Sequence, residues 1–85
     1  MSQEKLSLKG LNFQATKIEE NKNILTITLN RPEKKNALNN VMVNEICYAL
    51  AYAKQERSVR VIIIAAEGDI FCAGADLRRE ESESN

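Results

Sequence analysis

The feature that most constrains this chain is an apolar run from Val59 to Ala66, interrupted only by Arg60. Residues 61–64 are all β-branched, which favours a strand over a helix. Both alternating faces of this strand are apolar, so we expect it to be buried on both sides, as strands of parallel sheets are. One helix cannot cover two faces of a sheet, so the sequence predicts a second covering layer here.

Two further strands are predicted before this run. A loose alternation over Leu11 to Glu20 predicts the first, and the clearer alternation of Ile24 to Asn30 predicts the second. Asparagine tolerates positive φ, so Asn21-Lys22-Asn23 between them predicts an antiparallel hairpin. The second strand should place one apolar set on a single face, namely Leu25, Ile27 and Leu29.

A helix is predicted between the second and third strands. Pro32 ends the preceding strand, and Asn39 or Asn40 is the expected N-cap. From there to about Glu56, apolar residues recur at helical spacing. The expected core stripe consists of Met42, Val43, Ile46, Ala49, Leu50 and Ala53. Strand, helix and strand in this order predict a crossover between parallel strands, and therefore an α/β fold class.

Composition excludes several classes of function. Eighty-five residues suit one small domain or part of a larger one, and 12 basic residues balance 12 acidic ones. Charge therefore predicts neither nucleic-acid nor membrane binding. The chain has no histidine, and Cys47 and Cys72 form no C-x-x-C pair, so no metal site is expected. The N-terminal residues carry no secretory signal pattern, which leaves the cytoplasm as the simplest compartment.

The loop from Phe71 to Leu77 is the strongest candidate for chemistry. It follows the apolar strand, and its small residues 72–75 leave the backbone open to close approach by a ligand. If Asp76 or Leu77 begins a helix, nearby amides favour an oxyanion. The alternative, that small residues here only permit close packing, stays open.

Other reactive side chains near this loop have ordinary interpretations. Cys72 is more typical of a small buried hydrophobe than of a nucleophile. The basic pairs at 34–35 and 78–79 are more typical of a solvated face than of a phosphate site. Three acidic residues are interpreted as solvated turn acids rather than catalytic bases: Glu67, Asp69 and Asp76.

Three motifs together resemble one family. Asn30-Arg31-Pro32, Lys35-Asn36-Ala37-Leu38 and Phe71 to Leu77, with the apolar strand before the last, resemble the first third of the enoyl-CoA hydratase/isomerase, or crotonase, family over about residues 12–79. The resemblance implies the first ββα units of a crotonase-like spiral, incomplete on its own. It makes residues 1–77 the N-terminal part of an acyl-CoA-binding domain and residues 78–85 a charged polar tail.

The resemblance also implies site residues. The amide of Ala75 would be the catalytic group, as one of two donors to the thioester carbonyl. Lys35 and Ala37 would lie along the CoA, near its phosphates and pantetheine arm. The acyl-CoA site would be lined by Ala73, Asp76 and Leu77. No metal or cofactor is implied, because the CoA thioester is the substrate.

The function implied is that of an acyl-CoA enzyme that stabilises a thioester enolate, first an enoyl-CoA hydratase and otherwise an isomerase. Family members are roughly three times this length, and their second donor and acid/base carboxylates lie in later segments. We therefore expect a fragment, inactive alone, that the remainder of the domain completes, in a homotrimer or hexamer. A non-catalytic CoA-binding or assembly module is the alternative.

Overall fold

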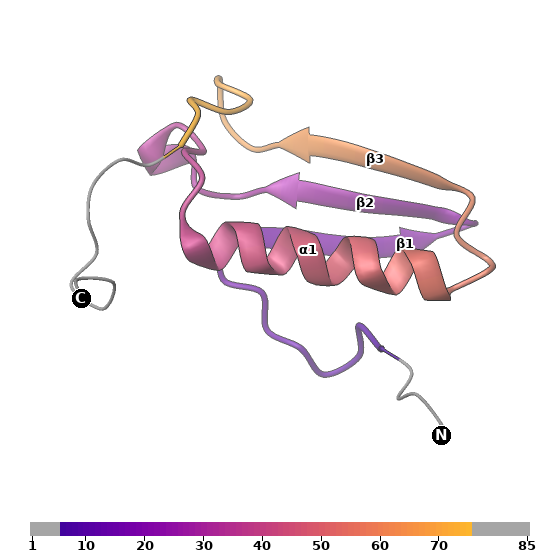
Figure 1. The fold of residues 1–85 in the computed structure, drawn as a ribbon. Coiled ribbons are helices and arrows are strands. Elements are labelled where there is room, and N and C mark those ends of the chain that lie inside the picture. The colour runs from indigo at the N-terminus through magenta and orange to yellow at the C-terminus, as the bar shows by residue number, and fades with distance from the viewer. Residues whose placement is uncertain (1–5, 76–85) are drawn as a thin grey trace, which may run out of the picture.

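A three-stranded sheet with one helix across it forms the fold. The computed structural model describes residues 6–75. Strands β1 (Thr16–Asn21), β2 (Ile24–Leu29) and β3 (Val61–Ala66) lie in the order β1-β2-β3. Helix α1 (Asn40–Gln55) packs on β1 and β2, and a 3₁₀ turn, η1 (Pro32–Lys34), lies between β2 and α1. Figure 1 shows β3 at the edge of the sheet, clear of the helix.

The predicted hairpin between β1 and β2 is confirmed. The strands are antiparallel, and Asn21 pairs with Ile24. Lys22 and Asn23 both have positive φ, of 52° and 72°. Two left-handed residues give a turn whose twist matches that of the flanking strands, and asparagine adopts this conformation at little cost.

The first strand is shorter than the predicted Leu11 to Glu20. It begins at Thr16, because the amides just before it are bonded to a helix rather than to a strand. The carboxylate of Glu45 on α1 accepts hydrogen bonds from the amides of Gln14 and Ala15, at 2.6 and 3.0 Å. It also accepts one from the hydroxyl of Thr16, at 2.7 Å. These contacts fix the segment before β1 against the helix.

Helix α1 begins as predicted. The side chain of Asn39 accepts a hydrogen bond from the amide of Met42 at 2.9 Å, which satisfies one of the free amides of the first turn. Two members of the predicted core stripe are nevertheless wrong: Val43 and Leu50 are exposed. The helix covers only β1 and β2, so its flank toward β3 has no strand beneath it.

The buried core lies between α1 and β2. It has two clusters, which meet at the half-buried Ile46. The buried members include the predicted apolar face of β2. The buried core residues are Ala15, Leu25, Ile27, Leu29, Met42 and Ala49.

Strand β3 is parallel to β2, as predicted, with Leu25 paired to Ile62 and Ile27 to Ile64. It begins at Val61 rather than Val59. The expected burial on both faces is wrong for residues 6–75, because Val61 to Ile64 are each 40–50% exposed. The reason is geometric: β3 is an edge strand of this sheet, and the helix does not reach over it.

The sheet face away from the helix changes character from β1 to β3. Leu25, Ile27 and Leu29 face the helix, so the residues between them face the other way. Across that face, charged positions on β1 pair with threonines on β2, and these pair with apolar positions on β3. One such row runs Glu19, Thr26, Ile63.

Within the described residues, no helix combines the length and the apolar character that crossing a bilayer requires.

Candidate functional site

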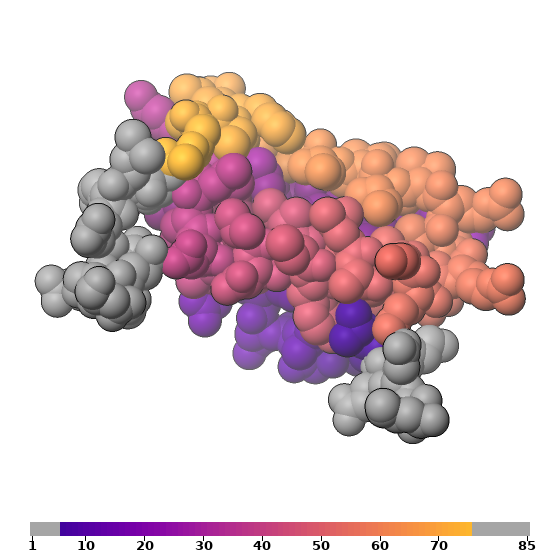
Figure 2. All heavy atoms as spheres, in the orientation of Figure 1, coloured from indigo at the N-terminus to yellow at the C-terminus, as the bar shows by residue number. Residues whose placement is uncertain are grey.

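Two loops meet at one end of the sheet. Because β2 and β3 are parallel, their carboxyl ends lie at the same edge. The loop after β2 (30–39) and the loop after β3 (67–75) therefore lie side by side there (Figures 1 and 2). Ligands of α/β proteins commonly bind beyond the carboxyl ends of parallel strands.

The two loops are joined through their backbones. The amide of Ala73 donates to the carbonyl of Lys35 at 3.0 Å, and the amide of Leu38 donates to the carbonyl of Gly74 at 2.8 Å. Leu38 and Ala75 form a parallel bridge. The structure thus brings together three of the residues predicted for the site, Lys35, Ala73 and Ala75, and Ala37 lies next to Leu38 in the same loop.

The amide of Ala75 points away from the loop after β2. No described residue follows a cis peptide bond, so the bond between Gly74 and Ala75 is trans. In a trans peptide the carbonyl and the following N–H point in opposite directions. The Gly74 carbonyl faces Leu38, so the Ala75 N–H faces the other side. Within residues 6–75 that N–H has no acceptor, and Ala75 is exposed.

The conformation of Gly74 sets this orientation. Its φ is +101°, and a β-carbon placed there would meet nothing within 4 Å. The glycine is therefore needed for its backbone angle rather than for space. Its own amide donates to the sulfur of Cys72 at 3.4 Å, and Cys72 packs against a buried cluster, as its interpretation as a small hydrophobe predicted.

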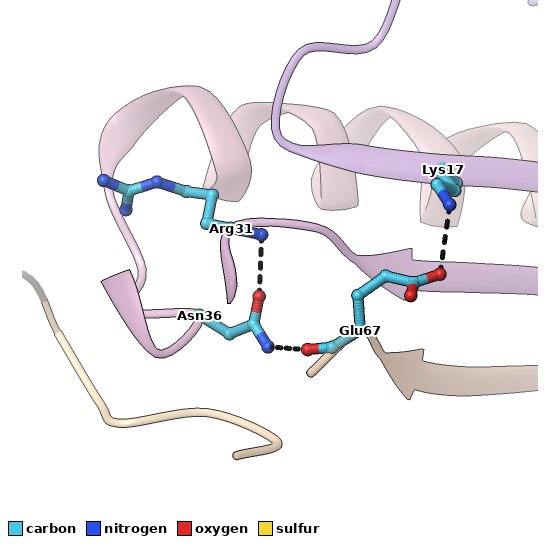
Figure 3. Close-up of polar contacts among 4 residues, drawn as sticks. All are labelled: Lys17, Arg31, Asn36 and Glu67. Carbon is cyan, nitrogen blue, oxygen red and sulfur yellow. Dashed lines mark hydrogen bonds and ion pairs between the residues drawn. The ribbon is translucent and has the colours of Figure 1, made fainter. Parts of the chain in front are cut away.

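Asn36 ties the two loops together, and sequence reasoning missed this role. Its side chain is fully buried. Its Oδ1 accepts from the amide of Arg31 at 2.7 Å, and its Nδ2 donates to the carbonyls of Glu67 and Ile70, both at 2.8 Å. Figure 3 shows the first two of these bonds. Its partners lie up to 34 residues away, so no local pattern could identify them; the only local signal is that asparagine tolerates its φ of 55°.

The loops also touch through Gly68 and Pro32. Gly68 has a φ of +87°, and a β-carbon there would lie 2.9 Å from the β-carbon of Pro32. A glycine is thus required at this point both for its backbone angle and for the close approach. The contact fixes the start of the loop after β3 against η1.

Of the three turn acids, the structure describes Glu67 and Asp69. The carboxylate of Glu67 pairs with the ammonium of Lys17 on β1 at 3.0 Å (Figure 3). Asp69 is exposed. Asp76 and Leu77 lie outside the described residues, as does the tail from 78 to 85. Among residues 6–75, no group of three or more potential metal ligands is present.

A cavity of about 330 Å³ lies between the two loops. Lys35 lines it, but Ala73 and Ala75 do not, so it is separate from the exposed amide. Ala37 instead contacts Arg31, whose guanidinium donates to its carbonyl. The cavity is lined by Pro32, Lys35, Glu67, Gly68, Asp69 and Ile70.

Comparison with known proteins identifies the family. The enoyl-CoA hydratase/isomerase family profile matches residues 19–85. The chain is 44% identical over 66 residues to mouse enoyl-CoA hydratase domain-containing protein 2, mitochondrial. The matched segment covers 76% of this chain and 22% of that protein.

Solved structures agree. An enoyl-CoA hydratase/isomerase from Mycobacterium paratuberculosis is 37% identical, with a TM-score of 0.75 over 84% of this chain and 28% of that one. Carnitinyl-CoA hydratase from Mycobacterium avium is 38% identical, with a TM-score of 0.73 over 75% of this chain and 25% of that one. The chain thus spans about a quarter of the length of these proteins. The matched profile and the shared crotonase-like fold show that the chain belongs to the enoyl-CoA hydratase/isomerase family.

Proposed function

We propose that this chain supplies one wall of an acyl-CoA site, in which the Ala75 amide donates a hydrogen bond to the thioester oxygen. The observation that carries the proposal is the N–H of the exposed residue Ala75, which is turned away from Leu38 and has no acceptor in residues 6–75. A donor aimed at a developing oxyanion can contribute about 10²–10³ in rate. The first candidate reaction is water addition to a 2-enoyl-CoA, and double-bond isomerisation is the second.

Acyl-CoA would run along the two joined loops. Lys35 would contact the phosphates, since an ammonium is a suitable partner for them. Ala37 and Ala73 would let the thin pantetheine arm and acyl group pass close to the backbone. Asp76 and Leu77 would continue this lining beyond the described residues. We propose no metal or cofactor, because the CoA thioester is itself the substrate.

Acid/base chemistry would come from other polypeptide. Hydration needs groups that activate water and deliver a proton, and the chain has no histidine. Two of its carboxylates are already engaged, Glu67 with Lys17 and Glu45 with the segment before β1. The remainder of the crotonase domain would supply these carboxylates and a second oxyanion donor, so the 85-residue chain alone should be inactive.

The proposal extends to the oligomeric state and the cellular compartment of the complete protein. The complete protein would form a homotrimer or hexamer, which sedimentation analysis tests. We propose a cytoplasmic location; the name of the mouse relative places that protein in mitochondria, so cell fractionation decides between the two.

The test uses the complete protein, meaning this chain with the polypeptide that completes its domain. Loss of the conjugated enoyl-thioester absorbance should follow addition of a 2-enoyl-CoA. Calorimetry with a series of acyl-CoA thioesters should show binding heat. No heat with any of them would refute the acyl-CoA site, and hydration by the 85-residue chain alone would refute the assignment of acid/base groups to other polypeptide.

A non-catalytic CoA-binding or assembly module is the second candidate. The observation that favours it is the engagement of Glu67 and Glu45 in structural contacts. Binding heat without turnover of any enoyl-CoA by the complete protein would support this module instead of the enzyme.

A further inference from the structure

The side chain of Asn36 lies between the two loops and is hydrogen-bonded to both of them. Its three hydrogen bonds fix the amide of Arg31 at one end of the loop after β2, and the carbonyls of Glu67 and Ile70 in the loop after β3. Lys35 and Leu38, which flank Asn36, hold Ala73 and Gly74 through backbone bonds. The side chain thus braces the near part of a loop whose far part carries the Ala75 amide.

Asn36 cannot act on a ligand directly. It is fully buried, and both polar atoms of its side chain already have partners. Whatever it contributes to a site must pass through the loop after β3. It is also left-handed, with φ 55°, so the backbone at this point is constrained independently of the side-chain bonds.

We propose that Asn36 is a positioning residue, whose side-chain amide aims the Ala75 N–H by clamping the loop after β3 to the loop after β2. The inference rests on the proposed oxyanion role of Ala75. Removing the clamp leaves residues 67–70 to move against residues 31–37. We expect the Ala75 N–H to be misoriented, which lowers kcat, while the affinity for CoA changes little because no atom of the CoA would touch Asn36. A displacement of about 1 Å at a reacting group can cost about 10²-fold in rate.

The chain offers a matched control in Asn23. It is also left-handed, with φ 72°, and its side chain also donates to a backbone carbonyl, that of Ser58, at 2.7 Å. It lies in the hairpin at the opposite end of the sheet. Asn36→Gly and Asn23→Gly therefore both remove an asparagine side chain from a position of positive φ; Asn23 is exposed and Asn36 is fully buried, and only Asn36 lies beside the site.

Asn36→Asp provides a second variant if Asn36→Gly does not fold. It keeps the shape of the side chain and the acceptor for Arg31, but an ionised carboxylate cannot donate to the carbonyls of Glu67 and Ile70. Both Asn36 variants should shift the loop after β3, whereas Asn23→Gly should not.

The experiment is made on the complete protein with three readouts. The first is kcat and KM for hydration of a 2-enoyl-CoA. The second is the infrared stretch of the bound thioester carbonyl, labelled isotopically, which falls when the carbonyl is polarised. The third is hydrogen exchange of the Ala73 and Leu38 amides, which join the two loops.

For both Asn36 variants we expect kcat to fall about 10- to 100-fold, with KM changed less than about threefold. The carbonyl stretch should return toward that of free thioester, and the two amides should exchange faster. Asn23→Gly should match the wild type in all three. Equal kcat and carbonyl stretch in the Asn36 and Asn23 variants would overturn the positioning role.

The two proposals fail differently. If the wild type itself neither turns over an enoyl-CoA nor shifts its carbonyl stretch, the oxyanion role of Ala75 is refuted, and the positioning role with it. If the wild type does both and the Asn36 variants do so equally well, only the role of Asn36 is refuted. Exchange at Ala73 and Leu38 shows in either case whether the clamp holds the loops.

Discussion

The carbonyl oxygen of Gly74 accepts a hydrogen bond from the amide of Leu38 at 2.8 Å. Together with the positive φ of Gly74, this bond orients the peptide plane so that the next N–H, that of Ala75, faces away from the loop after β2. The availability of the candidate donor is therefore a consequence of how the loop after β3 is paired, and each change that disturbs the pairing should affect the site.

Gly74→Ala should disturb the donor most directly. An alanine β-carbon meets no neighbour there, but a φ of +101° costs an L-residue about 1–2 kcal/mol, so the backbone is expected to shift. The complete protein should lose about tenfold or more in kcat for enoyl-CoA hydration, a part of what an oxyanion donor contributes.

Gly10→Ala is its control. Gly10 also has positive φ, +77°, and also has open space around an added β-carbon, but it lies in the segment before β1. Kinetics of this variant should match the wild type. A similar loss of kcat in both variants would mean that general strain, and not the Ala75 amide, accounts for the Gly74→Ala effect.

Gly68→Ala should destabilise the protein more than Gly74→Ala does. It combines an unfavourable φ with a contact of 2.9 Å to the β-carbon of Pro32. The contact part should be relieved by Pro32→Gly in the same chain, while the backbone part should remain. A double-mutant cycle in urea unfolding measures this coupling, and additive free energies would show that the two loops do not press on each other here.

Asn39→Ala should cost about 1 kcal/mol of unfolding free energy, the usual value of an N-cap. The loss follows from its bond to the Met42 amide at 2.9 Å. Asn39→Asp should retain most of the stability, since a carboxylate also caps and suits the positive end of the helix. Asn40→Ala is the neighbouring control, because Asn40 is exposed at the first helical position. Equal urea midpoints for Asn39→Ala and Asn40→Ala would contradict the capping role.

The raised pKa of Tyr52 predicts that the protein loses stability at high pH. Its hydroxyl donates to the carboxylate of Glu20, and this hydrogen bond, with desolvation and the charges of Glu20 and Glu56, raises the pKa of Tyr52 to about 12 from 10.0. The unfolded chain therefore releases the proton first, so this contribution to stability is complete below pH 10 and is lost as pH rises from 10 to about 12.

Urea unfolding across this pH range tests whether stability falls as the pH rises. Tyr52→Phe should show a shallower fall in stability with pH than the wild type. Tyr48→Phe is the control, because its hydroxyl binds the backbone of Ser7 rather than a carboxylate. An unchanged pH dependence in Tyr52→Phe would contradict the assignment.

Local patterns predicted the parts of the fold that depend on neighbours in the sequence. Alternation placed Leu25, Ile27 and Leu29 on the buried face of β2, and the side chain of Asn39 marked the start of the helix. Both depend on interactions within a few residues. Val43 and Leu50 fit the same helical period but are exposed, because periodicity shows which side of a helix is apolar and not how far the sheet beneath it extends.

The candidate site was predicted only in part for a similar reason. Small residues after a strand indicated that backbone amides would be accessible, and in the structure Ala75 is exposed and its N–H has no acceptor among residues 6–75. Asn36 was part of a motif that carried the family resemblance, but its bridging role was missed because it stands in a polar stretch that looks solvated, whereas its side chain is fully buried. Its partners Glu67 and Ile70 come next to it only after β3 pairs with β2.

The two edge strands of the sheet differ in charge, and this difference determines at which edge a further strand can pair. The β1 margin carries Lys17 and Glu19, and charges of this kind discourage another strand from docking. The β3 margin carries isoleucines on both faces and has no charged residue between Val61 and Ala66. An exposed apolar edge strand can pair with a strand of another chain, so we expect β3, and not β1, to be the margin at which further polypeptide adds to this sheet and at which aggregation would begin if none does.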